Sequence, residues 1–329
     1  MPRRQWTRAT LVAGVRAGDR RALARAITLV ESAHPLAYEV VRDLYPSTGR
    51  AYAVGITGPP GTGKSTLIGA LLGHVRQRGM TTGVIAVDPS SPFSQGALLG
   101  DRIRLSDHFL DPGVFIRSMG TRGHVGGLAE ATLQAVLLLD AAGKDVVLVE
   151  TVGTGQSEVE VAAVADTVVL VLMPGSGDSI QALKAGIMEI PDVIVVNKMD
   201  HPGAATLARE LRSILALDRD RAWRPPIVLA EAERGQGVAE LWQKVEEHRA
   251  FLEQEGLLER RRGEHLTAEV LALAVERAKA RLEEAARSDP ELLRLLDQVQ
   301  ARALDPLTAV QEILDRVLRL DDSDRSHAR

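Results

Sequence analysis

Short apolar runs alternate with amphipathic stretches between about residues 51 and 245, and this alternation predicts the core of the chain. The runs are rich in Val, Ile and Leu and have the length of strands that are buried on both faces. Between them, apolar residues recur at helical spacing. We therefore predict an α/β fold with a mostly parallel central sheet flanked by helices. The expected strands are residues 53–57, 83–87, 114–117, 145–149, 167–173, 193–196 and 226–229.

Both ends of the chain follow a helical pattern. Gly18-Asp19 interrupts the apolar spacing near the N-terminus, which predicts two helices there, and a third is expected over residues 39–44. Toward the C-terminus, Asp289-Pro290 and Asp305-Pro306 each have the pattern of a helix N-cap followed by proline. The expected parts are an N-terminal helical extension over 1–50, an α/β domain over 51–248 and a C-terminal helical region over 249–329. The last region has little chain to cover its apolar stripes, which favours docking on another subunit.

The composition of the 329 residues narrows the classes of partner and chemistry. With a net charge of −4 and only 3% aromatic residues, the chain lacks the basic surface and stacking platforms of nucleic-acid-binding proteins. It has no cysteine, which excludes disulfides, thiolate metal sites and cysteine nucleophiles. No apolar run approaches the roughly 18 residues of a membrane span, and no apolar segment follows the first arginines. We therefore expect a cytoplasmic protein without nucleic-acid or membrane partners.

Residues 58–66 read GPPGTGKST and match the G-x-x-x-x-G-K-S pattern of a phosphate-binding loop. The motif needs a strand before it and a helix after it, and the apolar pattern supplies both. The glycines let the backbone wrap an anion, Lys64 can reach the β- and γ-phosphates, and the Ser65 hydroxyl can bind Mg²⁺. A plain Gly/Pro turn before a helix would leave the Lys and the Ser unexplained. The expected nucleotide-binding residues of this loop are Gly58, Pro59, Pro60, Gly61, Thr62, Gly63, Lys64, Ser65 and Thr66.

A second motif predicts which base is bound. Asn197-Lys198-Met199-Asp200 follows the expected strand 193–196 and matches the N-K-x-D signature of GTP-binding proteins. The Asp200 carboxylate can accept two hydrogen bonds from the N1–H and N2–H₂ edge of guanine, which adenine lacks. The stem of Lys198 can cover the base, while Asn197 ties the loop to its neighbours. The two motifs together predict binding of GTP and GDP.

The segment Glu150-Thr-Val-Gly153 occupies the place of the D-x-x-G switch, with Glu where Asp is usual. The Glu150 carboxylate can hold Mg²⁺ directly or through water, and the Gly153 N–H can meet the γ-phosphate. Thr154, not glutamine, follows this glycine, so the water-positioning group of small GTPases is missing or displaced. This predicts slow intrinsic hydrolysis that a partner or another loop completes.

Two aspartates before this switch are further candidates. Asp101 could contact Mg²⁺ directly or through water, Asp88 could contact it through water, and either could activate the attacking water. Each also has a structural explanation, because Asp88 precedes Pro89 as turn residues do and Asp101 could cap a helix. A glycine-rich stretch over residues 119–128 carries Arg122 and His124, which could lie near the nucleotide, although His124 could equally start a helix.

The ordered segments GPPGTGKST, VDPSSPFSQGALLGDR, ETVGTGQSE, MPGSGDSIQALK and NKMD resemble those of the MeaB/ArgK/MMAA family, clearly over residues 7–245. The resemblance implies a P-loop GTPase that converts GTP and water to GDP and phosphate. It also implies a chaperone of an adenosylcobalamin-dependent acyl-CoA mutase, typically methylmalonyl-CoA mutase, which gates cofactor loading and protects the mutase. Members are usually homodimers through a C-terminal helical extension.

Two positions qualify the resemblance. Glu231 stands where the family's guanine-contacting loop would have Ser, although Ala232 could still offer its backbone N–H to guanine O6. The resemblance implies that residues 173–184 form a third switch, which would carry Lys184 toward the nucleotide when the mutase is bound. The alternative is a strand-to-helix turn capped by Asp178, with Lys184 in solvent.

Three other functions have different sequence requirements. A metabolite kinase, an old label for part of this family, would need an acceptor pocket and a base near the γ-phosphate. A GTPase for nickel-enzyme maturation normally needs Cys or His ligands, and this chain has no Cys and only scattered His. A purely structural role would leave both nucleotide motifs unexplained.

Overall fold

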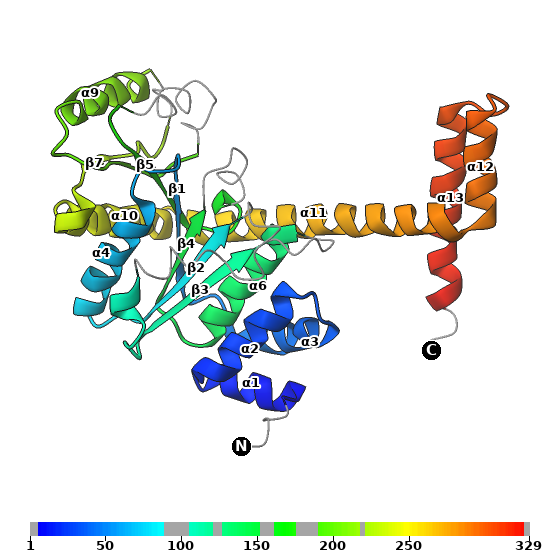
Figure 1. Cartoon of the computed structure of the whole chain (residues 1–329), viewed down its shortest axis with the longest axis horizontal. Coiled ribbons are helices and arrows are strands. Elements are labelled where there is room, and N and C mark those ends of the chain that lie inside the picture. The colour runs from blue at the N-terminus through cyan, green and yellow to red at the C-terminus, as the bar shows by residue number, and fades with distance from the viewer. Residues whose placement is uncertain are drawn as a thin grey trace. The chain divides into compact units, whose positions relative to one another are not determined.

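The computed structural model describes residues 6–88, 105–120, 127–151, 161–175, 190–217 and 221–325 (Figure 1). The chain divides into two compact units, Met1–Glu269 and Val270–Arg329. The expected boundary at residue 248 falls within helix α10 (Val238–Gln254), and the three-part functional division stays a prediction. Within the described residues, no helix combines the length and the apolar character needed to cross a membrane.

A seven-stranded, all-parallel sheet forms the centre of the first unit, in the order β3-β2-β4-β1-β5-β6-β7. This confirms the expected α/β fold, and each apolar run named above forms a strand. β1, β4, β5 and β6 are buried along their whole length, as expected for Val- and Ile-rich strands covered on both faces. The strands are β1 (Tyr52–Thr57), β2 (Thr82–Asp88), β3 (Val114–Gly120), β4 (Val146–Thr151), β5 (Thr167–Leu172), β6 (Val193–Val196) and β7 (Ile227–Leu229).

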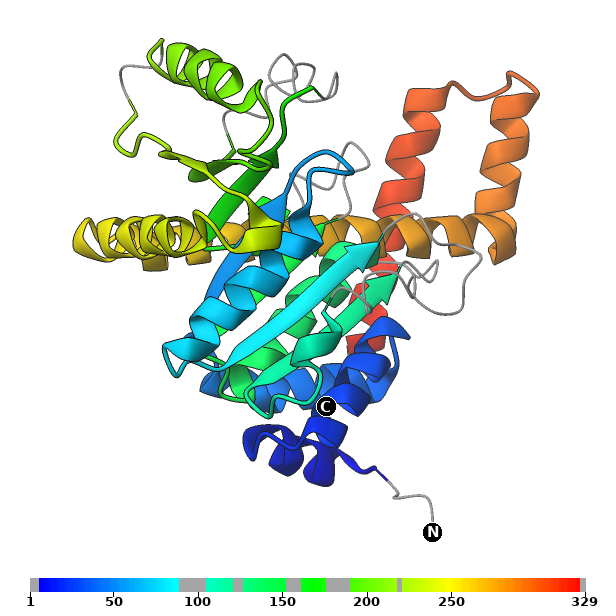
Figure 2. The same ribbon diagram turned by 60° about the vertical axis from the view of Figure 1, so that its left-hand side comes forward.

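Helices cover both faces of the sheet (Figure 1). One core holds apolar side chains of α1 (Arg8–Arg16), α2 (Arg20–Glu31), α3 (Pro35–Leu44) and α6 (Gly127–Ala141) against β2 and β4. Figure 2 shows the three N-terminal helices, in blue, beside this layer. A second core holds those of α4 (Lys64–Gln77) and α10 against β1 and β5, and α9 (Ala204–Leu215) packs on β5 and β6. The described residues also include the 3₁₀ turns η1 (Tyr45–Ser47), η2 (Ser106–His108) and η4 (Ala232–Arg234).

The N-terminal helices end and begin where the local signals predict. Gly18 has φ 69°, a conformation that glycine adopts without strain, and it separates α1 from α2. The Asp19 carboxylate then accepts hydrogen bonds from the backbone N–H groups of Arg21 (2.7 Å) and Ala22 (3.1 Å), so it caps α2. The predicted break at Gly18-Asp19 is therefore confirmed.

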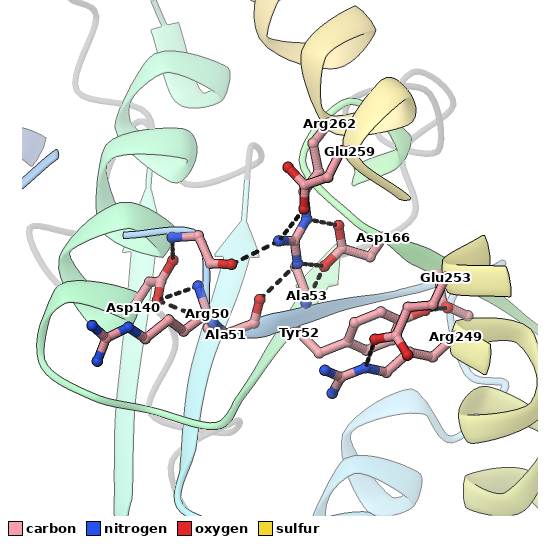
Figure 3. A network of polar contacts seen from close by, with 12 residues as sticks. Arg50, Ala51, Tyr52, Ala53, Asp140, Asp166, Arg249, Glu253, Glu259 and Arg262 are labelled. Carbon is pink, nitrogen blue, oxygen red and sulfur yellow. Dashed lines mark hydrogen bonds and ion pairs between the residues drawn. The ribbon is translucent and has the colours of Figure 1, made fainter. Parts of the chain in front are cut away.

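The amino ends of the central strands are held by a charged network, which we call the amino-edge network (Figure 3). Helix α11 (Leu257–Ser288) supplies Arg262, whose guanidinium donates to both oxygens of Asp166 at 2.7 Å and to the carbonyls of Gly49 and Ala51 at 2.9 Å. Asp166 precedes β5, and the residues 49–51 precede β1. The start of α11 is thus fixed to the entry of two neighbouring strands.

A second arginine extends this network to β6. Arg261 donates to the two carboxylate oxygens of Asp192 at 3.0 and 2.9 Å, and Asp192 directly precedes β6. On the other side of β1, the Asp140 carboxylate at the end of α6 accepts backbone N–H groups of residues 49, 50 and 51. Each aspartate therefore joins a helix or strand to a neighbouring strand entry through several hydrogen bonds.

The second unit contains the end of α11 followed by α12 (Pro290–Gln300) and α13 (Pro306–Arg325). The carboxylate of Asp289 accepts from the N–H of Glu291 at 2.9 Å, and that of Asp305 accepts from Leu307 and Thr308 at 3.1 and 3.0 Å. Both predicted Asp-Pro helix starts are therefore confirmed. Several large apolar side chains of this unit are exposed: Val270, Leu271, Val275, Leu293, Leu307, Val310 and Leu314.

Candidate nucleotide-binding site

The phosphate-binding loop joins β1 to α4, as its sequence context predicts. Gly58, Gly61 and Gly63 have φ values of 140°, 79° and 90°, which residues with a side chain rarely adopt. The surrounding atoms also leave no room for a side chain at two of these positions. A Cβ at position 58 would lie 2.1 Å from the carbonyl oxygen of Val171, and a Cβ at position 63 would lie 2.5 Å from Asn197 Nδ2. No side chain of the described residues caps the start of α4, so its first N–H groups suit an anion.

The Lys64 ammonium lies inside this loop. Its Nζ donates to the carbonyl oxygens of Gly58 at 2.7 Å and Pro59 at 3.0 Å, and the residue is only 7% exposed. Thr62 adds a hydrogen bond from its hydroxyl to the carbonyl of Pro59 at 2.9 Å. The cation is therefore placed where phosphate oxygens can replace loop carbonyls as acceptors, which is the position that Lys occupies in phosphate-binding loops.

Ser65 and Glu150 meet although they are far apart in the sequence. Ser65 is in the first turn of α4, Glu150 is in β4, and β4 pairs directly with β1. The Ser65 hydroxyl donates to Glu150 Oε1 at 2.7 Å, and the two residues are 6% and 2% exposed. A hydroxyl and a carboxylate are the hard oxygen donors that Mg²⁺ prefers, so these residues fit the metal that GTPases use.

Asn197 connects the phosphate loop to the expected guanine loop. Its side-chain Nδ2 donates to the carbonyl oxygen of Thr62 at 2.8 Å, and its Oδ1 accepts the backbone N–H of Ala232 at 3.1 Å. Lys198 has φ 57°, so the backbone turns sharply after Asn197, and both Lys198 and Asp200 are exposed. The arrangement leaves the Asp200 carboxylate accessible to a base.

The loop after β7 differs in one detail from the expectation. The Ala232 N–H, expected to face guanine O6, is held by Asn197 in this structure, and its contact with guanine stays a prediction. Glu231 pairs through its backbone with Gln236, and its carboxylate contacts Arg234 Nε at 3.1 Å. Arg234 was missed as a partner of Glu231, although the i, i+3 spacing of opposite charges was a usable signal.

The described residues do not include the side chains of several predicted site residues. Asp88 ends β2, where its backbone lies opposite Gly120 of β3, at the same edge of the sheet as the phosphate loop. The Asp88 side chain, and the whole of Asp101, Gly153, Arg122, His124 and Lys184, lie outside the described residues. Their expected contacts with nucleotide, Mg²⁺ or water stay predictions.

The parallel sheet, the phosphate loop and the N-K-x-D loop that Asn197 ties to it define a P-loop GTPase. The family model described as methylmalonyl-CoA mutase-associated GTPase MeaB matches residues 23–287. The chain therefore belongs to the MeaB family of GTPases, which confirms the resemblance seen in its motifs.

Individual relatives agree with this assignment. A protein of Pyrococcus abyssi is 49% identical over 312 residues, which are 94% of this chain and 96% of that protein. Its name describes it as a provisional GTPase. The GTPase ArgK of Escherichia coli is 38% identical over 262 residues, covering 77% of this chain and 79% of ArgK. A crystal structure titled LAO/AO transport system kinase superposes with a TM-score of 0.71 at 29% identity, covering 95% of this chain and 98% of the other.

Proposed function

We propose that this GTPase is the chaperone of an adenosylcobalamin-dependent acyl-CoA mutase of the methylmalonyl-CoA mutase type, which it protects and whose cofactor loading it gates. The family is named for association with methylmalonyl-CoA mutase, and that name supports the choice of partner. The observation that carries the nucleotide chemistry is Asn197, whose side chain hydrogen-bonds both Thr62 of the phosphate loop and Ala232 beside the base loop. These two hydrogen bonds join the loops expected to bind the phosphates and the base, which supports a single site that binds both parts of one nucleotide.

In the proposed reaction, water attacks the γ-phosphorus of GTP, the bond to the β–γ bridging oxygen breaks, and GDP and phosphate leave. Lys64 neutralises negative charge on the β- and γ-phosphate oxygens. Ser65 and Glu150 would hold Mg²⁺, which when bound would offset charge on the same phosphates; Asp101 is a further candidate ligand. Gly153 would bind the γ-phosphate, and Asp88 or Asp101 would orient the water. Lys198, Asp200 and Ala232 would surround the guanine.

The chain lacks a glutamine directly after Gly153, so we propose that the mutase completes the site. Lys184 would then supply transition-state charge only in the complex. Lys184→Ala should leave intrinsic hydrolysis and GTP affinity nearly unchanged and remove most of the mutase-stimulated rate. Steady-state phosphate release with and without mutase measures both. Equal loss in the two conditions would make Lys184 an ordinary active-site residue, and no loss would make it a surface lysine.

Gating is tested with apo-mutase, adenosylcobalamin and the purified chain. We expect cofactor transfer into the mutase to depend on whether GTP or GDP is bound, and inactivation of the loaded mutase to slow when the chain is present. If neither rate responds to the chain, it serves a different partner. We further propose a cytoplasmic homodimer formed through the helical region 249–329, which the mass of the full chain in solution will test.

Metabolite phosphorylation is the second candidate. The solved structure that covers 95% of this chain is titled LAO/AO transport system kinase, and this title is the reason to test for kinase activity. The two functions differ in the acceptor of the γ-phosphate, which is water for a GTPase and an amine or carboxylate for a kinase. Incubation with nucleotide and arginine or ornithine should yield inorganic phosphate alone. A phosphorylated metabolite would favour the kinase.

A further inference from the structure

A cavity lies at the amino edge of the sheet, opposite the nucleotide loops. It is open to solvent on one side and has a volume of about 470 Å³, within the range of roughly 300–1,000 Å³ that small-molecule sites occupy. Its walls come from Asp192 before β6, from residues 221–223, from α10 and from the start of α11. We propose that this cavity binds a small organic anion with a planar body. The proposal is independent of the mutase partnership.

The aromatic side chains of the cavity favour a planar ligand. Trp223 lies 4.9 Å from the ring of His248 and 5.2 Å from that of Phe251, measured between ring centroids. Trp223 Nε1 donates to the carbonyl oxygen of Asp192 at 2.8 Å, which fixes the indole to the sheet. The indole is therefore already oriented by contacts within the chain, which lowers the entropic cost of stacking a flat body on it.

The acidic group in the wall is neutralised by the chain itself. Asp192 accepts both Arg261 hydrogen bonds and the backbone N–H of Val168 at 2.8 Å. His248 Nε2 lies 3.4 Å from Asp192 Oδ1, and burial lowers the pKa of His248 to about 4, so this ring is neutral near pH 7. Asp192 consequently does not oppose an anion as an uncompensated carboxylate would.

The mouth of the cavity supplies positive charge. Three arginines, Arg221, Arg260 and Arg261, line the cavity together with two acids, Asp192 and Glu264. Arg260 Nε contacts Glu264 at 2.8 Å, but the two side chains are 73% and 62% exposed. An ion pair this exposed contributes little stability, so a carboxylate or phosphate on the ligand can replace Glu264 on the guanidinium.

The site is separate from the nucleotide. Asp192 precedes β6 and Asn197 follows it, so the strand spaces these two residues by about 16 Å at roughly 3.3 Å per residue. The cavity is instead bounded by α10 and by the part of α11 that carries Arg261. An anion bound there would stabilise the attachment of α11 to the sheet, because it binds the folded wall and not the unfolded chain.

The test uses Trp223 as its own reporter. Replacing Trp6 and Trp242 by Phe leaves one indole, and the full-length variant is titrated with benzoate and with phenyl phosphate. Benzyl alcohol and benzamidine serve as neutral and cationic probes of the same shape. We expect saturable quenching by the two anions and none by benzamidine. Preference for phenyl phosphate or for benzoate tells whether the natural ligand carries phosphate or carboxylate.

Variants distinguish the cavity from general binding. Arg260→Gln combined with Arg221→Gln should weaken anion binding at least about tenfold. Arg249→Gln is the matched control, because Arg249 also pairs with a glutamate four residues later at 2.8 Å on an exposed helix face, outside the cavity. It should bind the probes as wild type does. If the reporter variant does not fold, calorimetric titration of the wild-type and arginine variants gives the same comparison.

Four results would overturn the proposal. The first is the absence of saturable binding by either anion, and the second is an equal response to benzyl alcohol or benzamidine. The third is equal weakening by Arg249→Gln and by the Arg260/Arg221 pair. Release of a fluorescent GDP analogue by the probes, in parallel with quenching, would place them in the nucleotide site and also overturn it.

Discussion

The charged groups at the two edges of the central sheet have different kinds of partners. At the carboxyl edge, Lys64 is held by loop carbonyls that phosphate oxygens can replace, and the Asp200 side chain is exposed. At the amino edge, Asp166 is held by Arg262 and by the backbone N–H of Ala53 at 2.8 Å, all within the chain. The phosphate loop is arranged to exchange partners, and the pair of Arg262 and Asp166 is arranged to keep them.

This difference has an energetic consequence. Groups that keep buried partners within the chain contribute to folding, and removing one partner leaves an uncompensated buried charge. Groups whose partners a ligand replaces contribute to binding, and their loss need not weaken the fold. Mutations at the carboxyl edge should therefore change nucleotide affinity, and mutations of the buried Arg262 and Asp166 pair should change stability.

The largest effect is expected from Lys64→Ala. The ammonium is the fixed cation of the phosphate loop, so GTP and GDP affinity should fall by about a thousandfold, or ~4 kcal/mol. The free energy of unfolding should change by less than about 1 kcal/mol, since the acceptors described for Lys64 Nζ are carbonyls of the loop itself. Nucleotide titration and urea unfolding measure the two quantities, with Lys244→Ala on α10, outside the phosphate loop, as control. Wild-type GTP affinity in Lys64→Ala would refute the phosphate-loop assignment.

Arg262→Ala should have the opposite profile. It removes four hydrogen bonds and leaves Asp166, which is buried, without its cation. The Arg262 side chain is 20% exposed, so we expect a loss of about 3 kcal/mol, the low end for a broken buried ion pair. GTP affinity should stay within about twofold of wild type.

Arg249→Ala provides the control for this prediction. Its ion pair with Glu253 is 44% and 48% exposed, and its guanidinium lies 4.9 Å from the centre of the Tyr52 ring. It should cost about 1 kcal/mol or less. A parallel loss of GTP affinity in Arg262→Ala would show that the two edges are coupled, which would break the comparison.

Asp200→Asn sharpens the comparison by changing selectivity alone. The amide replaces one acceptor by a donor, so GTP should bind about 10- to 100-fold more weakly, or ~2 kcal/mol, while xanthine nucleotides bind more tightly. Stability should not change, because Asp200 is exposed. Competitive titration with GTP and XTP measures the shift. Unchanged affinity for both would mean that this loop does not read guanine.

The features that could be predicted from the sequence are those with local signals. Runs of β-branched residues fix the buried strands, and the Asp-Pro pairs fix two helix starts, since each signal acts over a few residues. The phosphate loop and the N-K-x-D loop belong to the same class, because their function depends on fixed spacing. Even the contact of Ser65 with Glu150 follows from two such motifs once β1 and β4 are neighbours.

The amino-edge network could not be predicted in this way. Arg262 and Asp166 are 96 positions apart, and Arg261 and Asp192 are 69 apart. The chain has 40 Lys and Arg and 44 Asp and Glu, so composition offers many pairings and no local rule selects among them. The choice depends on how α11 is rotated about its axis against the strand entries. The same packing creates the cavity beside Trp223.

The smallest expected effect is a dependence of stability on pH that originates at the amino edge. Burial lowers the pKa of His248 from 6.5 to about 4, and it lowers the pKa of His265 in the same direction. In the unfolded chain these rings protonate near pH 6.5, so between about pH 6.5 and 4 the unfolded state binds more protons. Stability is therefore complete above about pH 6.5 and falls as the pH decreases toward 4. From about pH 7 to about pH 5.5 we expect a loss of about 1 kcal/mol in urea unfolding. His248→Gln should remove most of this slope, whatever its effect on absolute stability, and the remainder reports His265. An unchanged slope in His248→Gln would mean that His248 does not titrate differently in the folded and unfolded chains.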